Sequence, residues 1–227
     1  MNKVKGIKEI PIFPLPLVLL PNEVLPLHIF EPRYRQMLED AMAGRKIFGV
    51  NFLDVESGSD TPKSGSTGCA AEIKEVQKLD DGRSNIVTSG LVRYRLIEYV
   101  ERETPYLVAD IEFFEDEPED ESLITPLADE AFELFQRMAQ AAYRMAGSRG
   151  HPPEVPRAEP ETLSFLVTAA FNLDNELKYS LLKTSLTSER LSRLRDILAQ
   201  SVSQIEEGAE ILRLSQTNGH SKKKLDI

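Results

Sequence analysis

A lysine beside two serines is the first candidate for covalent chemistry. Lys63 precedes Ser64 and lies close to Ser66, within the turn-rich residues 62–68. A serine–lysine pair can act as nucleophile and base, but only when the base is held within hydrogen-bonding distance, usually beside an oxyanion hole. The neighbours here are all turn-forming residues, so we interpret the segment as an exposed loop. The phosphate-binding pattern GxxxxGK[ST] is also absent. The sequence therefore predicts no catalytic residue.

Metal-binding residues are few and scattered. His28, His151 and His220 lie far apart, and none has a second ligand at the i+4 spacing typical of a helical metal site. The single cysteine, Cys69, excludes an internal disulfide, a CxxC redox pair and a zinc site built on cysteines. We expect no metal and no cofactor, and we interpret His28, which lies in an apolar run, as a hydrogen-bonded structural residue.

Two arginine–tyrosine–arginine triplets are the remaining candidates for a binding role, at residues 33–35 and 93–95. In a strand, Arg93 and Arg95 share one face and Tyr94 points to the other. Guanidinium groups beside aromatic rings could hold a peptide backbone or a carboxylate, or could bind single-stranded RNA by stacking and phosphate contacts. They could equally form structural ion pairs with Glu31, Glu98 or a nearby acidic loop. Residue types alone leave these readings open.

Composition narrows the classes of partner. The chain has 227 residues and a formal net charge of −10, with 41% hydrophobic and 28% charged residues. This is typical of a soluble globular protein, and the negative charge argues against DNA as a partner. No apolar run approaches the roughly 20 residues of a membrane helix, and prolines interrupt the apolar N-terminal stretch. We expect a cytoplasmic protein that does not bind membranes.

The first half of the chain has the pattern of a small β domain. Five prolines between residues 11 and 26 exclude a helix there and favour short edge strands. A helix is expected from Pro32, with Tyr34, Met37, Leu38, Ala41 and Met42 on one face, ending at Gly44. Further strands are expected at residues 47–53, 69–77, 85–89, 91–100 and 107–114, with a hairpin turn at Asp81-Gly82. The pattern predicts an antiparallel β-barrel or pseudobarrel.

The second half is helical in pattern. An acidic run at residues 115–121 marks the change, and helical periodicity follows. Asp174 is expected to cap a short helix, and Leu191, Leu194 and Leu198 to form the buried face of the last one. We predict an α+β protein with a β domain at residues 1–117, a helical bundle at 118–214 and a disordered tail at 215–227.

Residues 10–53 resemble the start of the N-terminal, substrate-recognition domain of Lon proteases. The resemblance centres on the uninterrupted LPLHIFEPRY at residues 25–34. Shorter matches follow in the family's order, with GCAAEI at 68–73, DGR at 81–83, GLVRYRL at 90–96 and PYLVA at 105–109. The helical half matches more loosely, through LDNELK at 173–178 and ERL at 189–191.

This resemblance implies a PUA-like pseudobarrel followed by a helical bundle. In complete Lon proteases the corresponding region recognises polypeptide substrates, while a separate ATPase module and a Ser-Lys peptidase domain do the chemistry. The 227 residues contain no Walker A lysine and leave no room for either module, so we expect a stand-alone member of the family. Ser66 inherits no role from the family's peptidase serine.

The sequence thus predicts a non-enzymatic module that binds unfolded or exposed polypeptide segments. The expected contact residues are Glu31, Arg33, Tyr34, Arg93 and Tyr94, whereas Pro14, Leu27 and Phe30 are expected in the core. RNA binding by a PUA-like module is the alternative, disfavoured by the acidic balance. An enzyme with a pocket invisible in sequence, or an adaptor that delivers clients to a separate protease or chaperone, also stays open.

Overall fold

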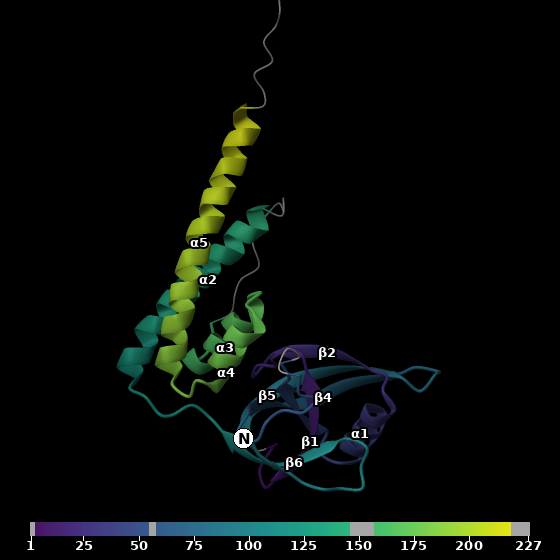
Figure 1. Cartoon of the computed structure of the whole chain (residues 1–227). Helices are drawn as coiled ribbons and strands as arrows, with labels where there is room; N and C mark the ends of the chain where they lie inside the picture. The colour runs from purple at the N-terminus through teal and green to yellow at the C-terminus, as the bar shows by residue number, and fades with distance from the viewer. Residues whose placement is uncertain (1–2, 55–57, 146–156, 219–227) are drawn as a thin grey trace, which may run out of the picture. The chain divides into compact units, whose positions relative to one another are not determined.

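The computed structural model describes residues 3–54, 58–145 and 157–218 of the chain (Figure 1). Contacts divide it into two compact units. The first, which we call the β unit, comprises Met1–Pro118 and Ser164–Leu186. The second, the helical unit, comprises Glu119–Leu163 and Thr187–Ile227.

The β unit contains six strands and a helix that follows the second strand. In chain order they are β1 (Glu9–Leu15), β2 (Val24–Ile29), α1 (Pro32–Ala43), β3 (Ile47–Phe52), β4 (Thr67–Lys78), β5 (Ser84–Tyr99) and β6 (Leu107–Phe114). Four further helices follow, namely α2 (Glu121–Met145), α3 (Pro160–Ala170), α4 (Asn175–Lys183) and α5 (Thr187–Asn218).

The six strands form one sheet that closes nearly into a ring. Their order is β2-β5-β4-β3-β1-β6, and β6 also pairs with β5. This confirms the predicted α+β pseudobarrel. One pair differs from the antiparallel expectation, because β1 and β3 run parallel. The connection between them contains β2 and α1, and a crossover of that length is what a parallel pair requires.

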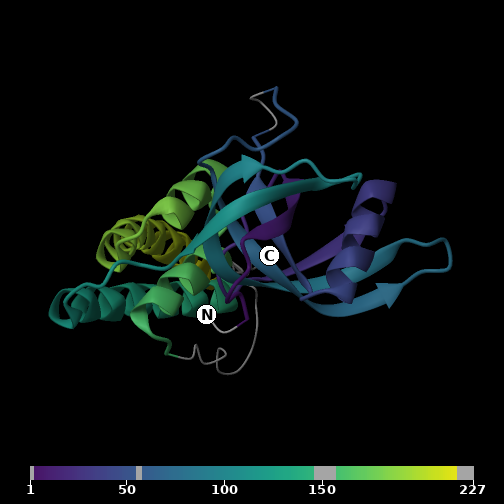
Figure 2. The ribbon, with the colours of Figure 1, turned by 90° about the horizontal axis from the view of Figure 1, so that it is seen from below.

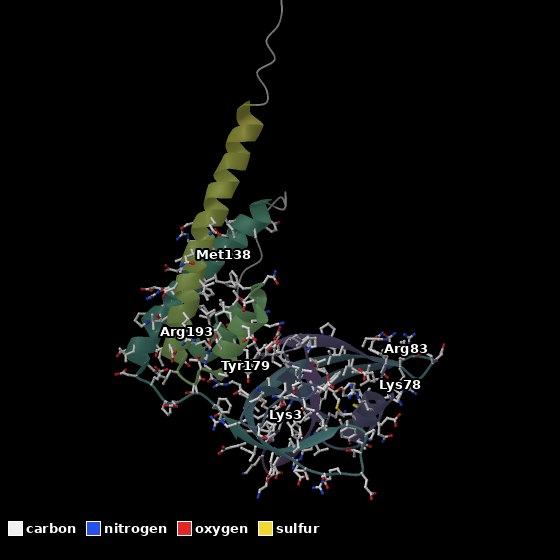
Figure 3. All side chains as sticks on the ribbon, in the orientation of Figure 1. Lys3, Lys78, Arg83, Met138, Tyr179 and Arg193 are labelled. Carbon is white, nitrogen blue, oxygen red and sulfur yellow. The ribbon has the colours of Figure 1, made fainter. Side chains whose placement is uncertain are left out.

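The long strand β5 joins two strands that the sequence predicts separately, at residues 85–89 and 91–100. Its first half, from Ser84, pairs with β2 and β4, and its second half, from Arg93, pairs with β4 and β6. Asp81 and Gly82 form the expected turn between β4 and β5, with Gly82 in the left-handed region at a φ of 80°. Figure 3 labels Lys78 and Arg83, which lie at the far end of this hairpin.

The helix α1 packs on the sheet as the sequence predicts. Tyr34, Met37, Leu38 and Ala41 are buried, and Gly44 follows the last helical turn. Met42 is the exception, since its side chain is exposed. The view in Figure 2 shows α1 beside the strands, near the β4–β5 hairpin.

The sheet separates two apolar cores, because successive strand residues point to opposite faces. Cys69 belongs to the first core with the buried residues of α1 and with Phe13, Phe48 and Ile86. Its neighbour Ala70 belongs to the second, with Ile10, Ile12, Tyr94 and Leu96. The alternation that predicted the strands therefore also assigns their side chains to a core.

A third apolar cluster joins residues 164–186 to the strands. Phe165 of α3 and Leu182 of α4 pack with Val18 and Leu20, which precede β2. The predicted division placed this segment in the helical domain at 118–214, whereas its contacts group it with the β unit. The side chain of Asp174 accepts a hydrogen bond from the Leu177 amide, which confirms the predicted cap of α4.

The helical unit is built mainly from α2 and α5, which pack against each other. Leu191, Leu194 and Leu198 are buried, as predicted, and α2 contributes Ala131 and Phe132. The helix α5 continues to Asn218 and so includes part of the predicted tail, while residues 219–227 lie outside the described residues. No helix in the described part of the chain is long and apolar enough to cross a membrane.

Candidate polypeptide-binding face

The strand β2 turns one side of the LPLHIF motif outward. Leu25 and Leu27 pack against the first core, and Ile29 is part of it. Val24, Pro26 and His28 point to the opposite face, and Phe30 follows the strand and stacks on the His28 ring with centroids 6.0 Å apart. Val24 is 64% exposed and Phe30 57%. Two large apolar side chains are therefore exposed on one strand face, which is an arrangement that marks interaction surfaces when it is extensive.

Cross-strand neighbours extend this surface over β5 and β4. Pro26 lies opposite Val87, and Val87 lies opposite Glu75. His28 lies opposite Asn85, and Asn85 opposite Gln77. These residues line a shallow hollow of about 420 Å³. We call the surface of Val24, Pro26, His28, Phe30, Asn85, Val87, Glu75 and Gln77 the β2 face.

A row of hydrogen bonds orients the polar part of the β2 face. The Oδ1 atom of Asn85 accepts from His28 Nδ1 at 2.7 Å, and Asn85 Nδ2 donates to Gln77 Oε1 at 3.4 Å. Because the carboxamide oxygen can only accept, this contact is a hydrogen bond when His28 Nδ1 carries a proton. Its Nε2 atom then faces Arg83 Nη1 at 3.5 Å. His28 thus has a hydrogen-bonding role, as the sequence predicted.

Charged pairs border the β2 face at the end of β2. Arg33 Nε donates to Glu31 Oε2 at 2.9 Å, and Arg83 Nε donates to Asp81 Oδ2 at 2.6 Å. The guanidinium of Arg83 lowers the pKa of Asp81, chiefly through this hydrogen bond. Pairs this exposed contribute little to stability. They supply charged groups beside the apolar and polar side chains of the β2 face.

Tyr34, the third predicted contact residue, is directed into the first core. Its ring lies 4.2 Å from that of Phe13, and burial raises the pKa of its hydroxyl. The guanidinium of Arg33 lies over the Tyr34 ring at 4.5 Å. Tyr34 therefore packs against the Arg33 guanidinium, and the burial of its ring in the first core fixes the start of α1.

Arg93 was expected at the surface but is 1% exposed. Its guanidinium forms an ion pair with the buried Asp116 and donates to the carbonyl oxygens of Leu182 and Thr184, at 3.1 and 2.7 Å. It also lies 5.3 Å from the Phe165 ring. Arg93 thus ties β5 to the segment 164–186 within the β unit, which corresponds to the structural reading of the triplet.

Tyr94 is fully buried, on the opposite side of β5 from Arg93. Its hydroxyl donates to the buried Asn51, and Asn51 Nδ2 donates to Ser66 Oγ at 3.1 Å. Burial raises the pKa of Tyr94 well above its ordinary value. The side chain lies across Gly49 and Gly68, where an added Cβ atom would come within 2.3 Å of the Tyr94 hydroxyl oxygen and 2.4 Å of its ring, respectively. Tyr94 is therefore a core residue, and the two triplets lie in separate parts of the β unit.

The serine–lysine segment has the geometry of a loop. Gly65 adopts a φ of 82°, and the Ser66 amide donates to the Lys63 carbonyl at 3.0 Å. The Ser66 hydroxyl contacts the Asn51 amide nitrogen, which cannot accept its proton. Among the described residues no group of three His, Cys, Asp or Glu side chains could hold a metal ion, while His151 and His220 lie outside them.

Cys69 is buried in the first core, and burial raises the pKa of its thiol to about 12. Since the thiolate is the reactive form, we expect no reaction of the folded protein with a disulfide reagent such as DTNB at pH 8. One equivalent should react after unfolding in guanidinium chloride. Release of the chromophore within seconds from the native protein would contradict the burial of this side chain.

Phe30 is misplaced in the opposite direction from Arg93 and Tyr94, since the sequence predicts it in the core and its side chain is exposed. The signal was available, because the alternation that directs Leu25, Leu27 and Ile29 inward directs Val24, Pro26, His28 and Phe30 outward. The side chains of Pro14 and Leu27, by contrast, are partly buried.

Comparisons with known proteins agree with the fold and extend over most of the chain. Residues 9–200 match the family model of the ATP-dependent protease La (LON) substrate-binding domain. Lon protease 2 of Myxococcus xanthus is 28% identical over 220 residues, covering 88% of this chain and 25% of that protein. Lon protease 2 of Herpetosiphon aurantiacus is 29% identical over 209 residues, covering 87% and 24%. The chain thus spans about a quarter of the length of these relatives.

Solved structures of the same kind share the architecture. The Lon N-terminal domain protein from Xanthomonas campestris superposes with a TM-score of 0.62 at 21% identity, covering 83% of this chain and 97% of that one. The N-terminal domain of the Mycobacterium avium complex Lon protease gives 0.63 at 19% identity, covering 85% and 98%. At these identities the likeness concerns the fold.

Proposed function

The chain belongs to the Lon protease substrate-binding domain family, and from this premise we propose that it binds polypeptide through the β2 face and has no catalytic activity of its own. The ligands are unfolded proteins or segments that expose apolar side chains. The proposed ligand is therefore the one that the sequence predicts. The proposed contact surface differs, because it lies on the outward side of the LPLHIF motif and not at the two arginine–tyrosine triplets.

The observation that carries the proposal is the exposure of Val24, at the start of β2, and of Phe30, directly after its end. Full burial of a side chain of this size contributes about 1.5–3 kcal/mol. The strand pairing of β2 and the contact with His28 hold both side chains in place before a ligand arrives, which reduces the entropy lost on binding. A surface of this kind suits short apolar segments of varied sequence.

Glu31 and Arg33 remain proposed contact residues, at the border of the face. Their ion pair is exposed, so each partner can exchange it for a charged group of the ligand. Tyr34 contributes indirectly, because its ring packs against the Arg33 guanidinium. Arg93 and Tyr94 act through the fold, since neither side chain reaches the surface of the β unit.

We place this activity in the cytoplasm, where a module of this kind would capture exposed segments in protein quality control. A separate protease or chaperone could receive the captured polypeptide, which would make the protein an adaptor. Neither role requires a cofactor or a nucleophile.

Fluorescence anisotropy with two labelled probes tests the class of ligand. We expect reduced, carbamidomethylated lysozyme to bind at 0.15 M salt, with an affinity that changes little as salt rises. A 20-nucleotide uridine RNA should not bind, because the β2 face carries few cations. Tight RNA binding that falls steeply with salt would replace the polypeptide proposal with the RNA alternative. A native, disulfide-bonded lysozyme sample serves as the matched control and should not bind.

A further inference from the structure

The strand β2 lies at the end of the sheet order. It pairs with β5, whereas β6 pairs with both β1 and β5 and so closes the ring. Within the described residues, the other edge of β2 pairs with no strand. An exposed strand edge presents main-chain donors and acceptors that can pair with a further strand.

The composition of β2 is unusual for an exposed edge. Its sequence, VLPLHI, contains no lysine, arginine, aspartate or glutamate. On the other side of the same three-strand ribbon, β4 continues beyond its pairing with β3 and carries Lys74, Glu75 and Lys78. Charged residues, lysine above all, are how proteins block strand addition at an edge. The β4 edge is blocked by charge, whereas the β2 edge carries no charge and only Pro26 removes one of its outward donors.

The register shows which main-chain groups of β2 face outward. The Gly90 amide donates to the Glu23 carbonyl at 2.9 Å, and paired positions alternate from there along the antiparallel ladder. Leu25, Leu27 and Ile29 therefore bond to β5. Val24, Pro26 and His28 direct their main-chain groups to the outer edge. Proline has no N–H, so the edge offers two donors and three acceptors.

We propose that an extended polypeptide segment from another protein adds to this edge as a further strand of the sheet, with every second side chain on the β2 face. This inference rests on the proposed function and specifies how the ligand is held. Main-chain bonds supply affinity without regard to sequence, and the apolar face selects segments with alternating apolar residues.

Pro26 also disfavours a second copy of this chain as the occupant. If two β2 strands paired antiparallel about a two-fold axis at their centre, Pro26 would face Pro26 of the other copy. Each Pro26 carbonyl would then face a residue that has no N–H, so neither carbonyl would have a hydrogen-bond donor opposite it. A ligand strand with a donor at this position satisfies the Pro26 carbonyl, so an unrelated segment fits better than a copy.

Alternately N-methylated peptides test the proposal, because methylation removes donors on one edge of a strand and leaves its side chains unchanged. The probe is a fluorescein-labelled peptide of alternating valine and threonine, ending in lysine for solubility. In the antiparallel arrangement, residues that bond to Val24, Pro26 and His28 also direct their side chains to the β2 face. We expect methylation of the valine nitrogens to weaken binding at least about tenfold, and methylation of the threonine nitrogens to have little effect.

Equal affinities of the two methylated peptides would overturn strand addition, and the proposed function would stand if denatured lysozyme still binds. If the parent peptide does not bind while denatured lysozyme does, strand addition would likewise be overturned and the proposed function would stand. Absence of binding by both probes would instead refute the proposed function itself.

A variant pair in the full chain gives a second readout. Val24→Pro removes one outward donor at the first residue of β2, where proline is tolerated. Val24→Ala keeps the donor and removes more of the side chain. Strand addition predicts that Val24→Pro binds the parent peptide about three- to tenfold more weakly than Val24→Ala, with circular dichroism unchanged. Binding by Val24→Pro as tight as by Val24→Ala would contradict it.

Discussion

Replacement of Arg93 by alanine is expected to lower the free energy of unfolding by about 3–5 kcal/mol, the usual loss when one partner is removed from a buried ion pair. The variant would leave the buried Asp116 carboxylate without this cation, and the carbonyls of Leu182 and Thr184 without these donors. Urea unfolding followed by tyrosine fluorescence measures the loss.

Arg95→Ala is the matched control for this change. Arg95 lies on the same face of β5, 5.6 Å from the Phe114 ring that Arg93 also contacts, but it is exposed. We expect Arg95→Ala to lower the free energy of unfolding by less than about 1 kcal/mol. Hydrogen exchange should also show faster exchange of amides in residues 164–186 for Arg93→Ala and no change for Arg95→Ala. Equal, small losses in both variants would contradict the structural role of Arg93.

Replacement of Gly90 by alanine is the second change with a large expected effect. An added Cβ atom would lie 2.1 Å from the carbonyl oxygen of Leu20 and 3.0 Å from its carbonyl carbon. Both are main-chain atoms of a fully buried residue, so the backbone itself has to shift. Overpacking of this kind costs about 1–3 kcal/mol, measured by the same urea titration.

The position of Gly90 also connects this change to the β2 face. Its amide donates to the Glu23 carbonyl and its carbonyl accepts from the Asn22 amide, directly before β2. We therefore expect Gly90→Ala to weaken binding of denatured lysozyme as well. Ser89→Ala, which adds no atom at the neighbouring position, should leave both stability and binding nearly unchanged. A Gly90→Ala protein as stable as the wild type would contradict the close approach of Gly90 to the Leu20 carbonyl.

Local patterns were sufficient for most of the β unit. Proline spacing, the Asp81-Gly82 turn and the alternation of apolar residues are properties of neighbouring residues, and each gave the right element. The parallel pairing of β1 with β3 was not accessible in this way, because it depends on the path of the chain through β2 and α1. The merging of two expected strands into β5 likewise depends on pairing with β2, β4 and β6.

Contacts between residues that are distant in the sequence also decide which candidate residues are buried. Nothing near Arg93 in the sequence indicates burial, because its partners are Asp116 and carbonyls around residue 183, which only the fold brings together. Phe30 is the opposite case. Its outward position follows from strand alternation, whereas the apolar character of the motif by itself suggests a core position.

The most direct test of the account compares Phe30→Ser with Ile97→Ser for binding of denatured lysozyme. Both wild-type side chains are exposed on the β unit, 57% for Phe30 and 44% for Ile97, and neither change alters charge. Circular dichroism should be the same for both variants. The β2 face predicts that Phe30→Ser binds at least about tenfold more weakly and that Ile97→Ser binds like the wild type. Equal affinity of the two variants would contradict the assignment of this face.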